Sequence, residues 1–300
     1  MNIAITGGTG FVGAHLARQL VARGHFPRLL ARGLNLRDET IRRLPNAAFT
    51  PLALTDDRKL FQSFQGCDLV AHLAGIWHEA TPGDFYKVHV ESTIHVIHAA
   101  RKAGVKKIVY MSYLKARPRC FSAWHESKYE AEELIRNSEL DYTILKPALM
   151  YGRNDHLLTT IARLLEITPS TGTVGLLEKT QRVVAVEDVV EILLASLLQN
   201  RLSRMTVPVM GPEELKVSGM IRKVSNVLKK PIVILPLPAL FQLYLASNVE
   251  KSSRDPLVPV VQVRMLAEGM DKVQPPCDDM PPDLQPKTFF NEEQIIRGLG

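Results

Sequence analysis

A glycine-rich turn near the N-terminus constrains the fold of this chain more than any other feature. The segment ITGGTGFVG, residues 5–13, places Gly7, Gly10 and Gly13 between an apolar run typical of a strand and an apolar-striped segment typical of a helix. Glycine permits the backbone angles of a tight turn and a close approach of the main chain to a ligand. Free N–H groups at the start of the helix favour an anion. The pattern therefore predicts a loop that binds the pyrophosphate of a dinucleotide.

The rest of the first half alternates between short apolar runs and longer amphipathic segments. Strands are predicted at residues 2–6, 26–31, 68–75, 106–112 and 141–147, with helices between them such as 11–23, 85–103 and 124–137. Parallel strands need helical crossovers and are buried on both faces, which explains the continuous apolar runs. We therefore predict an α/β protein with a doubly wound parallel sheet, the Rossmann fold.

Beyond about residue 147 the alternation breaks down. Helices are predicted at residues 186–198 and 215–230, and a strand at residues 205–210. We predict a dinucleotide-binding domain over residues 1–150. Residues 151–300 are predicted to be a mixed region that completes the sheet and forms a smaller C-terminal α+β lobe for a substrate or partner. The Pro- and Asp-rich segment 274–286 is predicted to be an extended surface tail.

Composition narrows the function classes. The net charge is +6, but Lys and Arg are spread along the chain, which argues against a nucleic-acid partner. Three cysteines that lie far apart in the sequence favour a reducing cytosol, and no leader is recognisable. His95 and His98 lack a third ligand, so no metal site is predicted. The apolar stretch 231–246 is shorter than the roughly 20 residues of a membrane span. A protein or membrane-surface contact through it stays open.

Further motifs follow in a familiar order. TGxxGxxG at residues 6–13, HLAG at residues 72–75, SKYEAE at residues 127–132 and ILKPALMYGR at residues 144–153 together resemble the short-chain dehydrogenase/reductase superfamily. The resemblance implies that the cofactor is contacted from the ends of the first, fourth, fifth and sixth strands and from the helix of residues 124–137. The implied contacts are Gly7, Thr9, Gly10, Phe11, Val12, Gly13, Leu73, Ala74, Gly75, Ser112, Lys128 and Pro147.

The end of the second predicted strand indicates which cofactor is preferred. An acidic residue there would accept from a ribose 2′-hydroxyl, whereas an arginine would hold a 2′-phosphate. Arg32 occupies the position, so NADP(H) is predicted over NAD(H). Arg37 could share this role, and a solvated Arg32 is the alternative. Asp56 matches the superfamily's adenine-contacting acid, and it can equally cap a helix.

The stretch FSAWHESKYEAEELI, residues 121–135, departs from the active members of the superfamily. Those members carry a tyrosine four residues before the lysine, on one face of a helix. Here Lys128 is present, but Trp124 stands in the tyrosine's place. An indole N–H can donate a hydrogen bond but cannot serve as an acid or base. Leu114 and His89 likewise replace the expected serine and asparagine, so ordinary catalysis is not expected.

Four other side chains near this helix and the following strand are candidate proton donors. His125 and Tyr129 are each one residue off the side that carries Trp124 and Lys128, so they are predicted to turn about 100° away from it. Tyr113 is predicted to point to the other side of its strand from its neighbours. Tyr151, after the sixth strand, is the most plausible substitute, and packing on the core is its alternative role. Lys128 can hold the nicotinamide ribose, or it can pair with Glu132 four residues on.

Loss of the tyrosine with retention of the glycines and the lysine resembles the atypical superfamily members, and in particular the subfamily of the NADPH-binding accessory subunit of respiratory complex I. That resemblance implies a cofactor-holding scaffold or assembly-type factor in the cytoplasm, with a peripheral position at a membrane as an open alternative. Its C-terminal lobe would then meet a protein or membrane partner. The alternative is an NADPH-dependent reductase, or a sugar-nucleotide-type epimerase or dehydratase, with an unusual proton donor.

Overall fold

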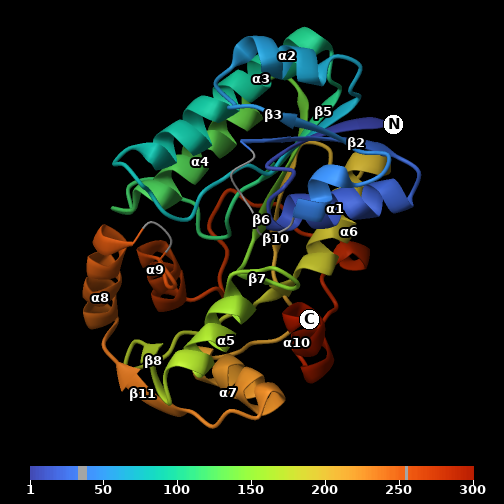
Figure 1. The fold of residues 1–300 in the computed structure, drawn as a ribbon. Helices are drawn as coiled ribbons and strands as arrows, with labels where there is room; N and C mark the ends of the chain where they lie inside the picture. The colour runs from blue at the N-terminus through green and yellow to red at the C-terminus, as the bar shows by residue number, and fades with distance from the viewer. Residues whose placement is uncertain (33–38, 254–255) are drawn as a thin grey trace. The chain divides into compact units, whose positions relative to one another are not determined.

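The structure is a computed structural model that describes residues 1–32, 39–253 and 256–300. Arg37 falls outside these residues. The chain forms two compact units (Figure 1). Unit 1 comprises Met1–Lys146, Val189–Pro208 and Gln274–Leu284, and unit 2 comprises Pro147–Asp188, Val209–Val273 and Gln285–Gly300.

The strands and helices follow one another as the alternating pattern predicts. The strands are β1 (Asn2–Thr6), β2 (Phe26–Ala31), β3 (Ala48–Pro51), β4 (Leu69–His72), β5 (Lys107–Met111), β6 (Asp141–Pro147), β7 (Met150–Tyr151), β8 (Ser170–Val174), β9 (Val184–Ala185), β10 (Met205–Val209) and β11 (Val233–Leu237). The helices are α1 (Phe11–Ala22), α2 (Asp57–Phe64), α3 (Ser92–Ala103), α4 (Ala123–Arg136), α5 (Leu157–Ile167), α6 (Val186–Leu198), α7 (Val217–Leu228), α8 (Ala239–Ser252), α9 (Val260–Glu268) and α10 (Glu292–Leu299). Shorter turns are the 3-10 segments Glu39–Arg43 and Pro282–Leu284 and the π-helical segment Tyr86–Glu91.

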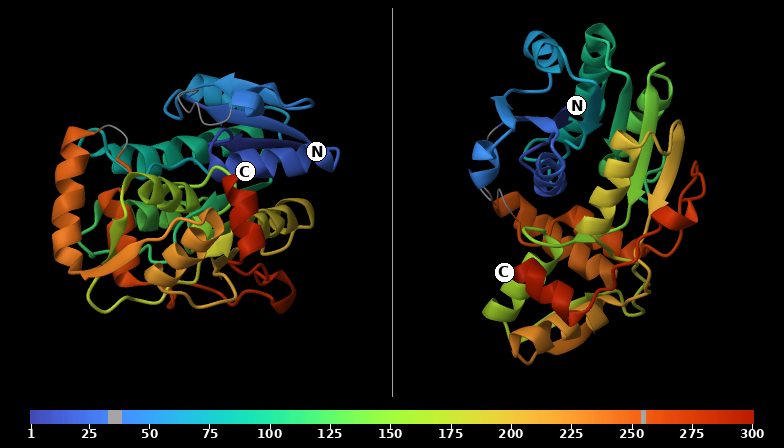
Figure 2. Two further views of the ribbon diagram at one scale, coloured as in Figure 1. Left: turned by 60° about the horizontal axis from the view of Figure 1, so that its bottom comes forward. Right: turned by 90° about the vertical axis from the view of Figure 1, so that its right-hand side faces the viewer.

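The central sheet has seven strands in the order β10-β6-β5-β4-β1-β2-β3. The neighbours from β6 to β3 pair in parallel, with Thr6 opposite both Leu30 and His72. Helices α2, α3 and α4 cover one face, and α1 and α6 cover the other (Figures 1 and 2). The predicted doubly wound parallel sheet is confirmed. Because the strand order reverses between β1 and β4, the ends of these two strands form the crevice where such sheets bind ligands.

Local sequence explains how the first elements begin and end. Helix α1 starts directly after Gly10 and buries Val12, Leu16 and Leu20 on the side that faces the sheet. Helix α3 ends at Gly104, whose φ of 73° lies in the left-handed region that glycine tolerates. The end of α3 at Gly104 lets the chain return to the edge of the sheet where the next strand, β5, begins.

The Pro- and Asp-rich segment differs in part from the prediction. Residues 274–284 are extended and mostly at the surface, as predicted, but they belong to unit 1 and are held to it by hydrogen bonds. The Asp278 N–H donates to the Thr206 carbonyl oxygen at 2.6 Å, and the Thr206 N–H donates to the Asp278 carboxylate at 2.7 Å. Extended backbone beside the edge strand β10 finds hydrogen-bond partners there, and Asp278 contributes both its N–H and its carboxylate to this pairing.

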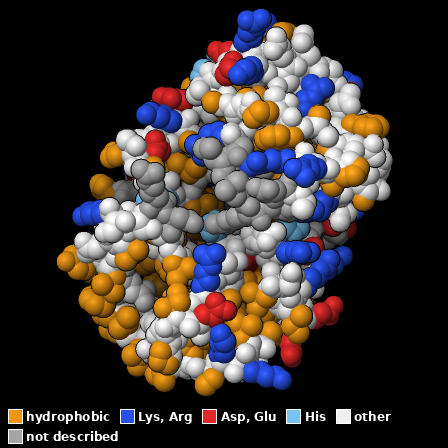
Figure 3. All heavy atoms as spheres, in the orientation of Figure 1, with side chains coloured by type: hydrophobic (Ala, Val, Ile, Leu, Met, Phe, Trp, Pro, Cys, Tyr) orange, Lys and Arg blue, Asp and Glu red, His pale blue; other side chains and the backbone are white. Residues whose placement is uncertain are grey.

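Unit 2 contains two small parallel pairs, β7 with β9 and β8 with β11, together with α5, α7, α8 and α9. Hydrophobic side chains gather on the surface over α8 and β11 (Figure 3). No helix among the described residues has the length and apolar character required to cross a bilayer.

Candidate functional site

The glycine loop after β1 is shaped by close main-chain contacts. The Gly7 N–H donates to the Leu30 carbonyl oxygen at 2.8 Å, and the Gly10 N–H donates to the Gly7 carbonyl oxygen at 2.9 Å. A Cβ added to Gly7 would lie 2.8 Å from the Ala74 nitrogen, and one added to Gly13 would overlap the Gly7 carbonyl oxygen. The loop therefore requires glycine at both positions, because neighbouring backbone occupies the space of a side chain.

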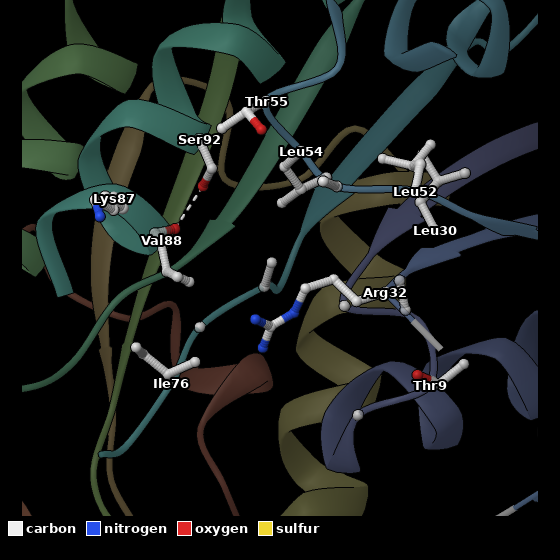
Figure 4. A pocket seen from close by; sticks show the side chains of 16 residues that line it. Thr9, Leu30, Arg32, Leu52, Leu54, Thr55, Ile76, Lys87, Val88 and Ser92 are labelled. Carbon is white, nitrogen blue, oxygen red and sulfur yellow. Dashed lines mark hydrogen bonds between the residues drawn. The ribbon is translucent and has the colours of Figure 1, made fainter. Parts of the chain in front are cut away.

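A cavity of about 310 Å³ opens beside this loop. Arg32 extends its guanidinium group into it from the end of β2 (Figure 4). Its volume lies at the lower end of the roughly 300–1,000 Å³ of small-molecule pockets. The lining residues are Gly7, Thr9, Gly10, Leu30, Ala31, Arg32, Leu52, Ala53, Leu54, Thr55, Ala74, Gly75, Ile76, Lys87, Val88 and Ser92.

Six of the predicted cofactor residues line this cavity: Gly7, Thr9, Gly10, Arg32, Ala74 and Gly75. Phe11, Val12 and Gly13 form the first turn of α1, and Leu73 follows β4. Sequence reasoning missed the apolar wall of Leu52 and Leu54, although the run PLALT at residues 51–55 is an apolar signal after β3. It also missed Val88, in the π-helical segment, and Ser92, at the start of α3.

Asp56 caps a helix. Its carboxylate accepts from the Lys59 N–H at 3.1 Å at the start of α2, which is one of the two roles expected for it. Its neighbour Thr55 lines the cavity. The adenine contact stays a prediction.

Ser112 belongs to a buried charge cluster. Its hydroxyl donates to the carboxylate of Glu132, which is fully buried. The same carboxylate lies 3.3 Å from the Lys146 Nζ and 2.7 Å from an Arg136 nitrogen. Two cations and a hydroxyl thus satisfy this buried charge, as a buried carboxylate requires. Glu132 is engaged here rather than with Lys128.

Lys128 lies behind the wall of the cavity. Its ammonium group donates to the Met111 carbonyl oxygen at 3.1 Å and lies 5.3 Å from the centre of the Tyr110 ring. A Cβ added to Gly75 would lie 3.2 Å from the Lys128 Nζ, so the ammonium adjoins a cavity-lining residue. Burial lowers the pKa of Lys128 to about 8, and the charge of Glu132 opposes that shift.

Trp124 fills the position of the missing tyrosine. The side chain is only 3% exposed, and its indole N–H donates to the Ile76 carbonyl oxygen at 2.9 Å. Its ring stacks on Trp77 with centroids 5.4 Å apart. Ile76 follows Gly75, which adjoins the Lys128 ammonium, so the indole hydrogen bond holds the main chain of this segment in place. Trp124 and Lys128 share one side of α4, as their spacing predicts.

Tyr113 and His125 also lie against this indole. Their ring centroids are 4.7 Å and 5.2 Å from the Trp124 ring. His125 directly follows Trp124 in α4, so their rings touch although the two side chains leave the helix about 100° apart. Residue 113 lies beyond the end of β5, where strand alternation no longer sets the direction of a side chain, and its ring reaches the indole.

His89 occupies the expected asparagine position, within the π-helical segment Tyr86–Glu91. Its Nε2 accepts from the Ile76 N–H at 3.3 Å, so its Nδ1 carries the proton and donates to the Ser127 hydroxyl at 2.9 Å. Burial, followed by the charge of Lys128, lowers the pKa of His89 well below 6.5. The imidazole is therefore neutral, and it supports the same Ile76 main chain that Trp124 holds.

His72 joins the ends of the strands at the crevice. Its ring nitrogens lie 2.6 Å from the Thr6 hydroxyl and 3.0 Å from the Thr93 hydroxyl, and the Thr93 hydroxyl donates to the His89 carbonyl oxygen. Burial, followed by the charge of Lys128, lowers the pKa of His72 to about 3. A neutral hydrogen-bonded chain therefore links β1, β4, α3 and the π-helical segment.

Tyr151 and Pro147 belong to unit 2. The Tyr151 hydroxyl donates to the Thr288 carbonyl oxygen at 3.5 Å, and its ring packs edge-on against Phe290 at 4.9 Å. Burial and the charges of Asp188, Glu187 and Glu213 raise the pKa of Tyr151. These contacts favour the packing role for Tyr151. Its catalytic role stays a prediction.

Among the residues that the structure describes, no three His, Cys, Asp or Glu side chains gather as a metal site. His95 instead meets the Asp57 carboxylate at 2.6 Å. The local chemistry near Gly75 is thus one buried ammonium, one neutral imidazole and one indole. The glycine loop and cavity fit a dinucleotide, whereas the polar groups of a usual proton-transfer set are replaced by aromatic and aliphatic side chains.

Comparison with known proteins agrees with this geometry. A family model described as NAD(P)H-binding matches residues 7–199. A ceramide reductase of Caulobacter vibrioides is 32% identical over 192 residues, covering 62% of this chain and 57% of that protein. The mitochondrial 40 kDa subunit of NADH-ubiquinone oxidoreductase from Neurospora crassa is 25% identical over 182 residues, covering 55% of this chain and 48% of the subunit. The chain thus spans about half the length of these two relatives.

A solved structure supports the fold over the whole chain. MoeE5 in complex with UDP-glucose and NAD has a TM-score of 0.74 and 16% identity, with 100% of this chain and 97% of that chain covered. At this identity the likeness concerns the fold alone. Since the family model covers well over half of the sequence, the chain belongs to the NAD(P)H-binding family.

Proposed function

We propose that the protein binds NADP(H) and holds it without ordinary turnover, as a cofactor-holding scaffold or assembly-type factor. The observation that carries this proposal is the state of Trp124. The indole stands where a proton donor would act, and its only N–H donates to the Ile76 main chain. General acid–base help is typically worth about 10²–10⁴ in rate, so its removal leaves binding as the better supported role.

The preference for NADP(H) rests on charge at the cavity. Arg32 projects into it (Figure 4), and none of the 16 lining residues that the structure describes is acidic. A ribose 2′-phosphate would meet the guanidinium group, which binds phosphate through paired N–H groups. A free 2′-hydroxyl would find no carboxylate among these residues.

The remaining roles follow from position. The main-chain N–H groups of the glycine loop and the start of α1 would hold the pyrophosphate. Lys128, beside Gly75, would hold the nicotinamide ribose. When bound, the cofactor supplies hydride chemistry, whereas the protein supplies binding and orientation.

The similarity to a complex I subunit supports a protein or membrane-proximal partner for the scaffold. The exposed apolar side chains of α8, among them Leu240 and Tyr244, offer a surface for that contact in unit 2.

Titration of NADPH and NADH into the protein tests the cofactor proposal. Arg32→Ala should weaken NADPH binding by about 10–100-fold, since a charge-assisted hydrogen bond is worth about 1.5–3 kcal/mol. NADH binding should change little. Arg43→Ala removes another exposed arginine outside the cavity lining and should leave both affinities unchanged. Equal weakening of NADPH and NADH by Arg32→Ala would contradict the 2′-phosphate role.

An NADPH-dependent reductase, or a sugar-nucleotide-type epimerase or dehydratase, is the second candidate. The lowered pKa of Lys128, about 8, favours it, because a group that titrates near neutral pH can exchange a proton. The similar ceramide reductase supports a reductase. Sustained NADPH oxidation with a panel of carbonyl compounds, lost in Lys128→Met while NADPH still binds, would overturn the scaffold proposal.

A further inference from the structure

Unit 2 contains an apolar cavity of about 340 Å³ that the cofactor does not explain. Its walls come from α5, β8, α7, β11, α8, α9 and the segment before α9. Met220 and Ile161, both buried, belong to the wall. The lining residues are Leu157, Thr160, Ile161, Leu164, Thr171, Gly172, Val174, Val217, Met220, Ile221, Leu237, Gln242, Leu245, Ala246, Val249, Leu257, Val258, Gln262, Val263 and Leu266.

The side chains that line this cavity disfavour a charged ligand. None of the described lining residues is Lys, Arg, His, Asp or Glu. A carboxylate or phosphate inside would lose its hydration without gaining a cation, which is strongly unfavourable. Apolar lining of this kind favours apolar molecules, because binding removes hydrocarbon surface from water. The cavity therefore suits a hydrocarbon ligand whose polar group, if any, is neutral.

Two polar side chains of the wall, Gln262 and Thr171, make no side-chain hydrogen bond with another residue that the structure describes. Gln262 is only 6% exposed, and its amide makes no hydrogen bond with any other residue that the structure describes. The other polar groups differ, since Gln242 donates to the Thr173 carbonyl oxygen at 2.8 Å and Thr160 to the Leu257 carbonyl oxygen at 3.2 Å. The amide atoms of Gln262 keep accessible surface, as expected for a polar group that lines a cavity. A ligand oxygen near Gln262 would accept a hydrogen bond from this amide.

The cavity has an apolar mouth at α8. Leu245 and Val249 line it and are 44% and 49% exposed. Other apolar residues of the same helix, Leu240 and Tyr244, face solvent, so the surface over α8 is hydrophobic (Figure 3). A hydrocarbon chain could pass between an apolar phase and the cavity along this helix without crossing a charged rim.

We propose that this cavity binds an uncharged single-chain lipid, with the hydrocarbon chain among the aliphatic side chains and a hydroxyl, ketone or amide group at Gln262. The site lies within unit 2 and uses none of the dinucleotide residues. It goes beyond the proposed cofactor role, and it can be tested without cofactor.

Fluorescence of N-phenyl-1-naphthylamine, a neutral apolar dye, reports occupancy of the cavity, and straight-chain competitors displace it. Decan-1-ol should displace the dye at least tenfold more strongly than decanoate, because decanoate is charged at neutral pH. Decan-1-ol should also bind about tenfold more tightly than octan-1-ol, since each buried methylene strengthens binding several-fold. Equal displacement by decan-1-ol and decanoate would overturn the proposal.

Matched variants locate the site. Val249→Trp places a large ring at the mouth and should weaken dye and decan-1-ol binding at least tenfold. Leu240→Trp makes the same kind of change on an 80% exposed residue of the same helix, outside the lining, and should have no effect. Gln262→Leu keeps the size of the side chain, so dye binding should persist while decan-1-ol binding falls about tenfold.

Three results would contradict the proposal. They are equal weakening by Val249→Trp and Leu240→Trp, unchanged decan-1-ol affinity in Gln262→Leu, and a dimer in sedimentation that both tryptophan variants dissociate while no dye binds. The last result would mean that a second copy of the chain covers this face.

Discussion

The glycine loop and the first turn of α4 contact the same segment of unit 1, residues 74–76. The loop keeps the residues that the family pattern requires, whereas α4 does not. At the loop, Gly7 packs against Ala74 as the family pattern requires. At α4, Trp124 holds the Ile76 carbonyl oxygen where a tyrosine would present its hydroxyl. Dinucleotide binding depends on main-chain geometry, whereas proton transfer depends on individual side chains. The second can be lost without disturbing the first.

The replacements near α4 also gain structural roles. The Trp124 indole N–H and the His89 Nε2 bind the carbonyl oxygen and the N–H of the same residue, Ile76. Both polar main-chain groups of that residue are thereby satisfied. Trp124 and His89 thus both fix the main chain of Ile76, which lines the cavity beside the glycine loop.

Gly13→Ala should produce the largest effect, because it disrupts the glycine loop while leaving α4 unchanged. The added methyl group would overlap the Gly7 carbonyl oxygen, which is backbone and cannot turn aside. NADPH affinity, measured by fluorescence titration, should fall at least about 100-fold, because displacing the loop costs about 3 kcal/mol.

Gly219→Ala is the matched control for that change. It lies inside α7, and an added Cβ would have no neighbour within 4 Å. It should leave NADPH binding unchanged and raise the free energy of unfolding by about 0.5–1 kcal/mol. Tight NADPH binding by Gly13→Ala would show that the loop does not hold the cofactor.

Lys128 supplies a pH test of the α4 side. Its pKa is about 8 in the folded protein and 10.5 ordinarily, so between these values the unfolded chain binds the proton and the folded protein does not. Stability therefore rises with pH across this window, and below pH 8 the burial of the charge is fully unfavourable. Relative to Lys128→Met, the free energy of unfolding of the wild type should increase by about 3 kcal/mol from pH 8 to 10.5. Denaturant titrations at each pH measure this difference. A free energy of unfolding that changes equally with pH in the wild type and in Lys128→Met would contradict a buried ammonium at Lys128.

Sequence reasoning predicted features that depend on local pattern. The parallel sheet, the glycine loop and the shared side of Trp124 and Lys128 follow from apolar runs, glycine spacing and the helical repeat. It missed features that depend on distant partners. Residues 274–284 join unit 1 because Thr206 offers main-chain partners, and Ser112 pairs with Glu132 because a buried carboxylate needs donors. Neither partnership leaves a periodic signal in the chain.

Trp124→Phe sharpens the comparison by removing only the indole N–H and part of the ring. The Ile76 carbonyl oxygen would lose its donor, so the free energy of unfolding should fall by about 1–3 kcal/mol. Thermal and denaturant unfolding measure this change. Phe121→Leu, at a 95% exposed position two residues before α4, should change stability by less than about 0.5 kcal/mol. A Trp124→Phe variant as stable as the wild type would remove the structural role assigned to the indole.

Tyr151→Phe should give the smallest effect and tests whether unit 2 supplies the missing acid. The hydroxyl makes one long hydrogen bond, 3.5 Å to the Thr288 carbonyl oxygen, so its removal should lower the free energy of unfolding by only about 0.5 kcal/mol. Phenylalanine keeps the edge-on contact with Phe290, whereas Tyr151→Ala would lose it and should cost about 3–5 kcal/mol. Burial raises the pKa of Tyr151, which disfavours its ionised form, so NADPH binding and any NADPH oxidation should be unchanged in Tyr151→Phe. Loss of sustained oxidation in this variant would instead identify Tyr151 as the donor, because the change leaves the packing intact and removes only the hydroxyl group.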